Sequence, residues 1–149
     1  SLYTFWKRTA PPPSLMTFDA PSREVCVSRR ARTNTPLQAL VLMNDEQYVE
    51  AARHMAARIL KEGGSKPEER LTYGFRLATA RVPAASELEV LKKLLGQNMA
   101  YFQGHKDDAN KLLAVGEMKV ADGFDPAELA AYTMIANALI NLDETITKE

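Results

Sequence analysis

Cysteine occurs only once in this chain of 149 residues, at Cys26. A single thiol excludes an internal disulfide and any zinc or iron–sulfur site that needs several thiolates. Since the sequence contains no Cys-x-x-Cys-His arrangement, covalent attachment of a c-type haem is excluded as well. The sequence therefore predicts no cofactor within this chain.

Net charge and long apolar runs are also lacking. Lysine and arginine number 19, as do aspartate and glutamate, so the formal charge is zero and no global field attracts nucleic acid or an anionic membrane. No apolar run approaches the roughly 20 residues needed to cross a bilayer, and the first residues lack the basic-then-apolar pattern of a signal peptide. We therefore expect neither a nucleic-acid partner nor membrane insertion.

The length fits one domain, but the opening of the chain is unusually aromatic. Leu2, Tyr3, Phe5 and Trp6 would stay in contact with water unless they packed against something. We therefore expect further sequence upstream, and interpret residues 1–149 as one domain from the C-terminal end of a larger protein.

Residues 1–35 are predicted to form an extended, proline-rich arm. They show no sustained hydrophobic period, and Pro11–Pro13 favour a polyproline II stretch without amide donors. Because the arm is too aromatic for a flexible linker, we expect it to lie across the helical part, with Trp6 and Phe18 as anchors.

Residues 36–149 are predicted to form the helical part. A helix begins at Pro36, where a side chain of residues 33–35 can cap and proline suits the first helical position. A break is expected near Asn44, which can form a capping pair with Gln47, and residues 63–65, Gly-Gly-Ser, end the segment. The predicted buried face of this helical segment consists of Leu37, Leu40, Val41, Tyr48, Ala51, Ala52, Met55 and Ile59.

Further helix starts follow along the chain. Proline or a capping pair marks them at Pro67, at Ser86 with Glu89, and at Asp125 with Pro126. The predicted spans are 67–82, 86–102, a short segment around 112–113, and 126–140. With no alternating strand pair in the sequence, the predicted fold is all-α: an irregular bundle of about four to six helices with an extended N-terminal arm.

Arginines cluster at the end of the arm. Guanidinium groups bind planar or tetrahedral oxyanions, and a helix start adds free amides and a positive dipole end. The candidate anion or partner contacts are Arg23, Arg29, Arg30 and Arg32. The simpler alternative is that these arginines pair with Asp19, Glu24 or acidic residues of an upstream domain and fix the arm in place.

Other chemically interesting residues have ordinary explanations. Cys26 could be reactive or pair with an upstream cysteine, but a lone cysteine is more often buried. His54 and His105 lack the spacing or carboxylate pairing of a metal ligand or a base. Helix starts or solvated faces explain the acidic pairs Glu68–Glu69, Asp107–Asp108 and Asp143–Glu144. We interpret the methionines as core filler: Met16, Met43, Met55, Met99, Met118 and Met134. The sequence thus predicts no catalytic, cofactor-binding or metal-ligating residue.

Several motifs together resemble a known family. They are residues 29–40 (Arg-Arg-Ala-Arg-Thr-Asn-Thr-Pro-Leu-Gln-Ala-Leu), 18–21 (Phe-Asp-Ala-Pro), 23–26 (Arg-Glu-Val-Cys), 3–9 (Tyr-Thr-Phe-Trp-Lys-Arg-Thr) and 138–144 (Ala-Leu-Ile-Asn-Leu-Asp-Glu). The chain resembles the C-terminal domain of unknown function of large secreted planctomycete-type proteins that carry cytochrome-c-like domains. The resemblance implies a periplasmic or extracellular, envelope-associated setting with haem elsewhere in the full-length protein, and it implies no activity.

Three functional interpretations follow. The leading one is a non-catalytic scaffold or docking module that packs on the upstream domains of the same polypeptide. The first alternative is part of an enzyme site for polysaccharide or sulfated-sugar chemistry, completed by an upstream domain. In this interpretation Asp19, Arg29, Arg30 and Arg32 reach into a shared cleft. The second alternative is an anion- or glycan-binding module, which predicts arginines open to solvent around a pocket.

Overall fold

A computed structural model describes residues 5–7, 9–29, 32–118 and 123–147. The helices in these ranges are α1 (Pro13–Thr17), α2 (Pro36–Asn44), α3 (Glu46–Glu62), α4 (Pro67–Thr79), α5 (Ala85–Gly104), α6 (Lys106–Leu113), α7 (Pro126–Ile140) and α8 (Asp143–Ile146). No strand occurs within them, so the predicted all-α class is confirmed. The one-turn helices α1 and α8 were not predicted.

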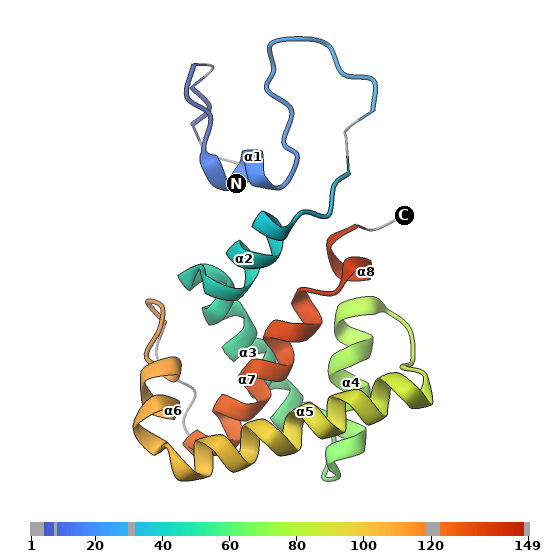
Figure 1. Ribbon diagram of the computed structural model, residues 1–149, viewed down its shortest axis with the longest axis vertical. Coiled ribbons are helices and arrows are strands. Elements are labelled where there is room, and N and C mark those ends of the chain that lie inside the picture. Colours follow the sequence, from blue (N-terminus) through green and yellow to red (C-terminus); the bar gives the residue numbers. More distant parts are fainter. Residues whose placement is uncertain (1–4, 8, 30–31, 119–122, 148–149) are drawn as a thin grey trace.

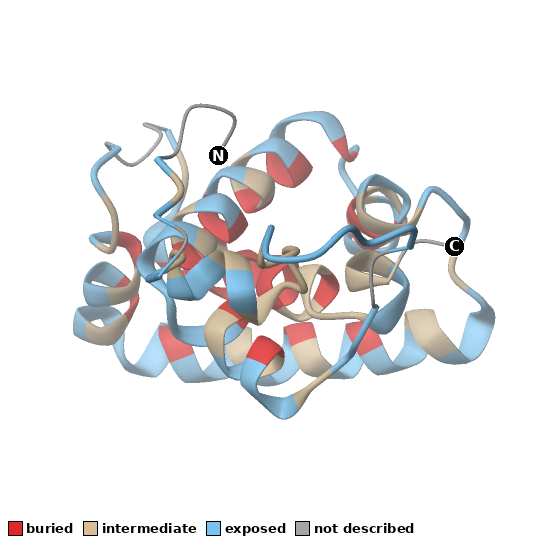
Figure 2. Cartoon of the chain, turned by 90° about the horizontal axis from the view of Figure 1, so that it is seen from above, coloured by how far each residue is buried: buried red, intermediate tan, exposed pale blue. Residues whose placement is uncertain are grey.

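Helix α7 forms the centre of the bundle and is surrounded by α3, α4, α5 and α6 (Figure 1). Its alanines at 130, 131 and 136 are fully buried, and such small side chains let neighbouring helices approach closely. The same closeness appears at Gly74 of α4, where a Cβ would lie only 2.6 Å from Cδ1 of Ile59 on α3. Figure 2 shows the buried residues gathered on the inner faces of the helices.

The predicted break between α2 and α3 is confirmed. Asp45 is extended (φ −71°, ψ 133°), and its carboxylate accepts a hydrogen bond from the Gln47 amide at 3.0 Å, so it caps α3. Asn44 instead donates its side-chain amide to the Leu40 carbonyl at 2.8 Å. The cap is therefore Asp45, not the Asn44–Gln47 pair that was expected.

The predicted buried face of the first two helices was wrong in part. Leu37 and Leu40 are 56% and 59% exposed, whereas Gln38 and Leu42 are the buried residues of α2. In α3 the buried face consists of Val49, Ala52, Arg53, Ala56, Ile59 and Leu60. A nine-residue helix that is apolar nearly all round offers no clear sequence signal for the side that faces the core.

The start of α5 also differs from the prediction. The Glu87 carboxylate accepts the Ala84 amide at 2.7 Å, so the capping interaction lies two residues before the expected Ser86–Glu89 box. Helix α7 does begin as predicted, because the Asp125 carboxylate accepts the Glu128 amide at 3.0 Å.

The arm is not extended throughout. Pro12 keeps a polyproline-like backbone (φ −57°, ψ 126°), but Pro13 opens α1, since proline fits the first helical position. Phe18 packs on Tyr48 of α3 with ring centroids 5.7 Å apart, in agreement with its expected role as an anchor. The ring contact of Trp6 is with Arg23, within the arm.

None of the described helices is both long enough and apolar enough to span a bilayer.

Candidate functional site

The junction between the arm and α2 is built from polar side chains. The Asp19 carboxylate accepts hydrogen bonds from the Thr33 amide at 2.7 Å and from the Thr33 hydroxyl at 2.9 Å. Gln38, only 1% exposed, donates to the Thr17 carbonyl at 2.8 Å and to the Thr33 hydroxyl at 3.2 Å. Asp19 itself has a positive φ of 57°, a conformation that aspartate tolerates better than most residues. These bonds bring residues 17–19 against residues 33–38, so that the loop of the arm between them, here called the outer loop, starts and ends at the same place.

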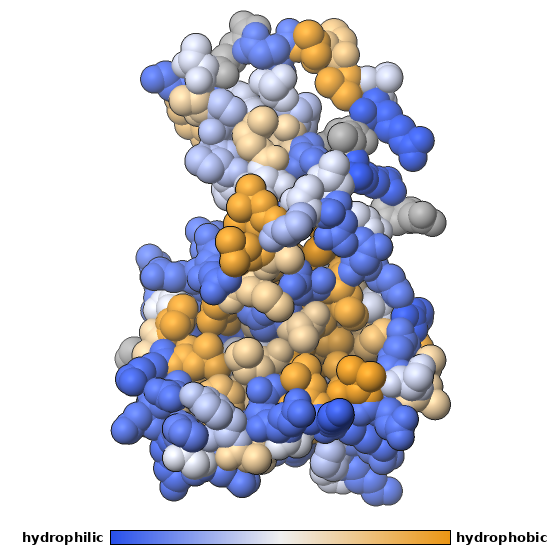
Figure 3. Space-filling view, in the orientation of Figure 1, coloured by the Kyte–Doolittle hydropathy of each residue, from blue (hydrophilic) through white to orange (hydrophobic). Residues whose placement is uncertain are grey.

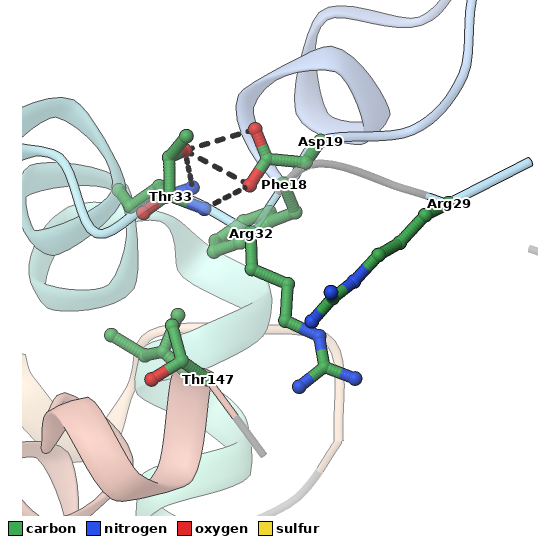
Figure 4. Close-up of a pocket in the computed structure, with 8 residues that line it drawn as sticks. Phe18, Asp19, Arg29, Arg32, Thr33 and Thr147 are labelled. Atoms are coloured by element: carbon green, nitrogen blue, oxygen red, sulfur yellow. Dashed lines mark hydrogen bonds between the residues drawn. The ribbon is translucent and has the colours of Figure 1, made fainter. Parts of the chain in front are cut away.

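A cleft of about 450 Å³ opens beside this junction (Figure 4). Its walls come from the arm, from the start of α2 and from the C-terminal segment around α8. The lining residues are Phe18, Asp19, Arg29, Arg32, Thr33, Gln38, Ile146 and Thr147. A second cleft of about 570 Å³ shares Arg29, Arg32 and Thr147 with it and adds Asn34 and Asp143.

The wall formed by the segment around α8 is hydrogen-bonded to the arm. Asn34 donates its side-chain amide to the Asp143 carboxylate at 2.7 Å, across 109 positions of sequence. The Thr147 hydroxyl lies 2.9 Å from the Asp143 carbonyl and 3.1 Å from its carboxylate. The Asn34–Asp143 bond therefore joins the two walls of the cleft.

The structure brings together two of the four predicted arginines. Arg29 and Arg32 line both clefts, and Figure 4 shows their guanidinium groups directed toward each other, to one side of Thr147. Both are exposed, and neither forms an ion pair with a carboxylate in the part of the chain that the structure describes. Arg23 lies elsewhere, with its guanidinium 5.1 Å from the centre of the Trp6 ring. Arg30 falls outside the described residues.

Amides at the start of α2, where free ones were expected beside these arginines, are in part already bonded. The Thr35 hydroxyl accepts the Gln38 amide at 3.3 Å, and the Gln38 side-chain oxygen accepts the Thr35 amide at 2.9 Å. The Thr33 amide is bound to Asp19. An anion in the cleft would therefore be held by the guanidinium groups of Arg29 and Arg32.

The remaining candidates are scattered over the surface. Cys26 is exposed, contrary to the simpler expectation that it is buried. His105 stacks on Tyr101 with ring centroids 4.4 Å apart, and His54 lies 3.8 Å from the Glu50 carboxylate. In the described ranges no group of three or more histidine, cysteine or acidic side chains could hold a metal ion.

The acidic pairs face separate cationic or phenolic partners. Glu68 pairs with Lys92, and Asp108 accepts the Tyr101 hydroxyl at 3.0 Å. Glu144 pairs with Arg81 at 2.7 Å. Four methionines are exposed, so core packing describes only Met55 and Met99; the exposed ones are Met16, Met43, Met118 and Met134.

Sequence reasoning missed a buried arginine. Arg53, 2% exposed, donates to the carbonyls of Leu113 and, at 2.7 Å, Met118, and so holds the end of α6 and the loop after it. Glu50 accepts the amides of Glu117 and Met118 at 3.0 and 3.1 Å, and these bonds, Glu117 first, lower the pKa of its carboxyl. The signal in the sequence was available, because position 53 lies on the helical face of the buried residues 49, 56 and 60.

The fold and the cleft define an all-α domain with an arm folded onto one end of a helical bundle. A family model matches residues 1–95, and the chain belongs to this family, PSD1, described as proteins of unknown function (DUF1553). The matched region contains the arm, α2, α3 and α4, and with them every arginine of the cleft. No curated protein and no solved structure matches the chain.

Proposed function

We propose that this chain is a non-catalytic docking module that binds a neighbouring protein domain through the exposed face of α2. One observation carries this proposal. Helix α2 contains no charged residue, and its Leu37, Leu40 and Met43 are 56%, 59% and 51% exposed. Contiguous apolar surface of this kind marks an interaction site far more often than isolated exposed leucines do.

The arm carries a second, separate apolar surface. Val25 is 70% exposed and Phe5 is 82% exposed, and both belong to the segment that lies at the α2 end of the molecule. Figure 3 shows hydrophobic surface over α2 and on the outer loop of the arm, separated by hydrophilic residues. Arg29 and Arg32, which line the clefts at the start of α2, add positive charge at this end of the molecule. A partner with an apolar strip flanked by acidic side chains would complement both features.

The occupant that we propose is the part of the same polypeptide that precedes this domain. The arm lies next to α2, so a domain joined to its N-terminal side would lie beside the exposed face (Figure 1). We further propose the setting that the resemblance implies: an exported, envelope-associated, planctomycete-type protein with cytochrome-c-like domains elsewhere. A shared catalytic cleft for polysaccharide or sulfated-sugar chemistry stays a prediction.

Methionine oxidation provides the test. Met43 is 51% exposed on the proposed face, and Met118 is 62% exposed in the loop after α6, outside it. Both are expected to oxidise readily in the 149-residue chain, because exposed thioethers react with peroxide. In the whole polypeptide, isolated from its natural cells, oxidation of Met43 is expected to slow several-fold while that of Met118 is unchanged. Peptide mass spectrometry over a time course measures both rates.

A pair of variants makes the test specific. Leu40→Glu in the whole polypeptide is expected to restore the oxidation of Met43, because a buried unpaired carboxylate opposes docking. Val90→Glu is the control, since Val90 is 66% exposed on α5 and lies outside the proposed face. Equal rates of Met43 oxidation in the 149-residue chain and in the whole polypeptide would contradict the proposal. Protection of Met43 in the isolated chain that disappears on dilution would instead assign the face to a second copy.

A further inference from the structure

Two guanidinium groups line one cleft without a carboxylate partner in the described residues. Arg29 and Arg32 come from the returning end of the arm's outer loop, three positions apart, and both border the two adjoining clefts. Like charges brought into one concave space repel each other, and an anion between them removes that repulsion. This arrangement goes beyond the apolar face of α2, because it offers charge-assisted hydrogen bonds rather than apolar contact.

The walls of the clefts carry carboxylates as well as arginines. Asp19 stands on the wall formed by the arm, and Asp143 stands on the wall formed by α8. Both carboxylates are fixed in place: Asp19 by Thr33, and Asp143 by Asn34. Among the described residues, the lining of the two clefts holds two arginines and two aspartates. Their attraction and repulsion both scale with the charge of a bound anion, so charge alone does not select between singly and doubly charged ligands.

The apolar part of the lining then indicates the chemistry of the ligand. The planar fork of arginine pairs with carboxylate, sulfate and phosphate oxygens alike, so the fork alone does not select among them. Phe18 and Ile146 line the same cleft and can contact a carbon skeleton, which favours an organic anion over an inorganic one. We propose that the cleft between the arm and α8 binds an organic carboxylate through Arg29 and Arg32. The carboxylate belongs either to a small organic acid or to an acidic side chain of a protein segment.

Nuclear magnetic resonance titration of the ¹⁵N-labelled 149-residue chain tests this proposal. The probes are acetate, an acetylated triglutamate peptide and sulfate, at pH 7 and constant ionic strength. Two exposed arginines are expected to bind acetate with a dissociation constant on the order of 1–10 mM. Saturable shifts are expected at the Nε–H signals of Arg29 and Arg32 and at the Thr147 amide.

Matched variants assign the site. Arg29→Gln and Arg32→Gln are each expected to weaken acetate binding by about tenfold, through loss of one charge-assisted pair. Arg76→Gln is the control, because Arg76 is an exposed arginine of α4 that lines neither cleft, and this change is expected to leave binding unaltered. Amide spectra of all variants are compared to establish that the fold is retained.

The two organic probes separate the sources of the carboxylate. Binding of triglutamate about tenfold tighter than acetate, with the gain lost in Arg32→Gln, supports an acidic protein segment. Affinities within about twofold of each other support a small organic acid. Three results would overturn the inference: sulfate binding as tightly as acetate, no saturable shift up to about 100 mM of any probe, or equal loss of binding in Arg76→Gln. These results do not depend on whether Met43 is covered by a partner.

Discussion

The two ends of this molecule are held together in different ways. Around α7 the contacts are apolar and dense: Leu71, Ile135 and Leu139 are fully buried. In the described part of the arm, large apolar side chains such as Phe5 and Val25 face outward, and the segment is attached by the packing of Phe18 on Tyr48 and by hydrogen bonds such as those of Asp19 and Gln38. Packing stabilises the first region by many small contacts, whereas the second depends on individual polar groups. The core can stay folded while the arm opens, because regions with few buried contacts open locally.

The largest expected effect contrasts the same substitution in the two regions. Leu139→Ala is expected to lower the free energy of unfolding by about 3 kcal/mol, because it leaves a cavity at a fully buried position beside Gly74. Leu40→Ala, at a residue 59% exposed, is expected to cost about 0.5 kcal/mol or less. Urea denaturation followed by circular dichroism measures both. Equal costs would mean that the face of α2 is already covered in the isolated chain.

A smaller effect is expected where the arm is attached. Gln38→Ala removes the donor to the Thr17 carbonyl and the acceptor of the Thr35 amide, at an expected cost of about 1–2 kcal/mol. Hydrogen exchange is expected to accelerate at the Thr33 amide while amides in α7 keep their protection. Gln47→Ala serves as the control, because its exposed side chain lies on α3 and its backbone amide alone takes part in the cap. Uniform acceleration throughout α7 would show that the arm and the core unfold together.

The smallest effect is a pH dependence at the start of α5. Glu87 has a pKa lowered to about 2, first by the hydrogen bonds of Arg81 and then by the Ala84 amide. A lowered pKa in the folded state stabilises the protein above the ordinary value, and this stabilisation is lost as pH falls from about 4.5 to about 2.

Substitution isolates this contribution to stability. Glu87→Gln is expected to lower the melting temperature by only about 2 °C at pH 6, because the pair with Arg81 is partly exposed to solvent. The difference in melting temperature between variant and wild type is expected to shrink as pH falls and Glu87 of the wild type is protonated. Glu89→Gln is the control on the same helix, since Glu89 is exposed and outside the Arg81 interaction. A gap that stays constant from pH 6 to pH 3 would exclude titration of Glu87 as its cause.

The local features of the fold could be predicted because they depend on neighbouring residues. Pro36 and Pro126 begin helices, Gly63 ends one, and the break after Asn44 lies where expected, since each involves a backbone preference or a nearby cap. The side of α2 that is buried depends on α3 and α7, which the sequence of α2 does not contain. The one-turn helix α8 likewise depends on tertiary support, because four residues cannot form a stable helix alone.

The candidate site was predictable only in part, for the same reason. The arginines stand out in the sequence, but the cleft between them and Thr147 arises from contacts more than 100 positions apart, including the 109-position separation between Asn34 and Asp143. No local pattern indicates that Arg23 turns away toward Trp6 while Arg29 and Arg32 face the cleft. Arg53 illustrates the opposite case, since a strict count of the helical face would have placed it inside.

The exposed thiol of Cys26 has a practical consequence for any measurement of mass or assembly. Because it is the only cysteine in the sequence and lies at the surface between Val25 and Val27, air oxidation can join two copies covalently. Such a dimer would imitate a docked pair and should vanish in reducing buffer or in Cys26→Ser. The same thiol accepts a single maleimide dye at a unique position on the arm, where a change in emission would signal contact with a partner.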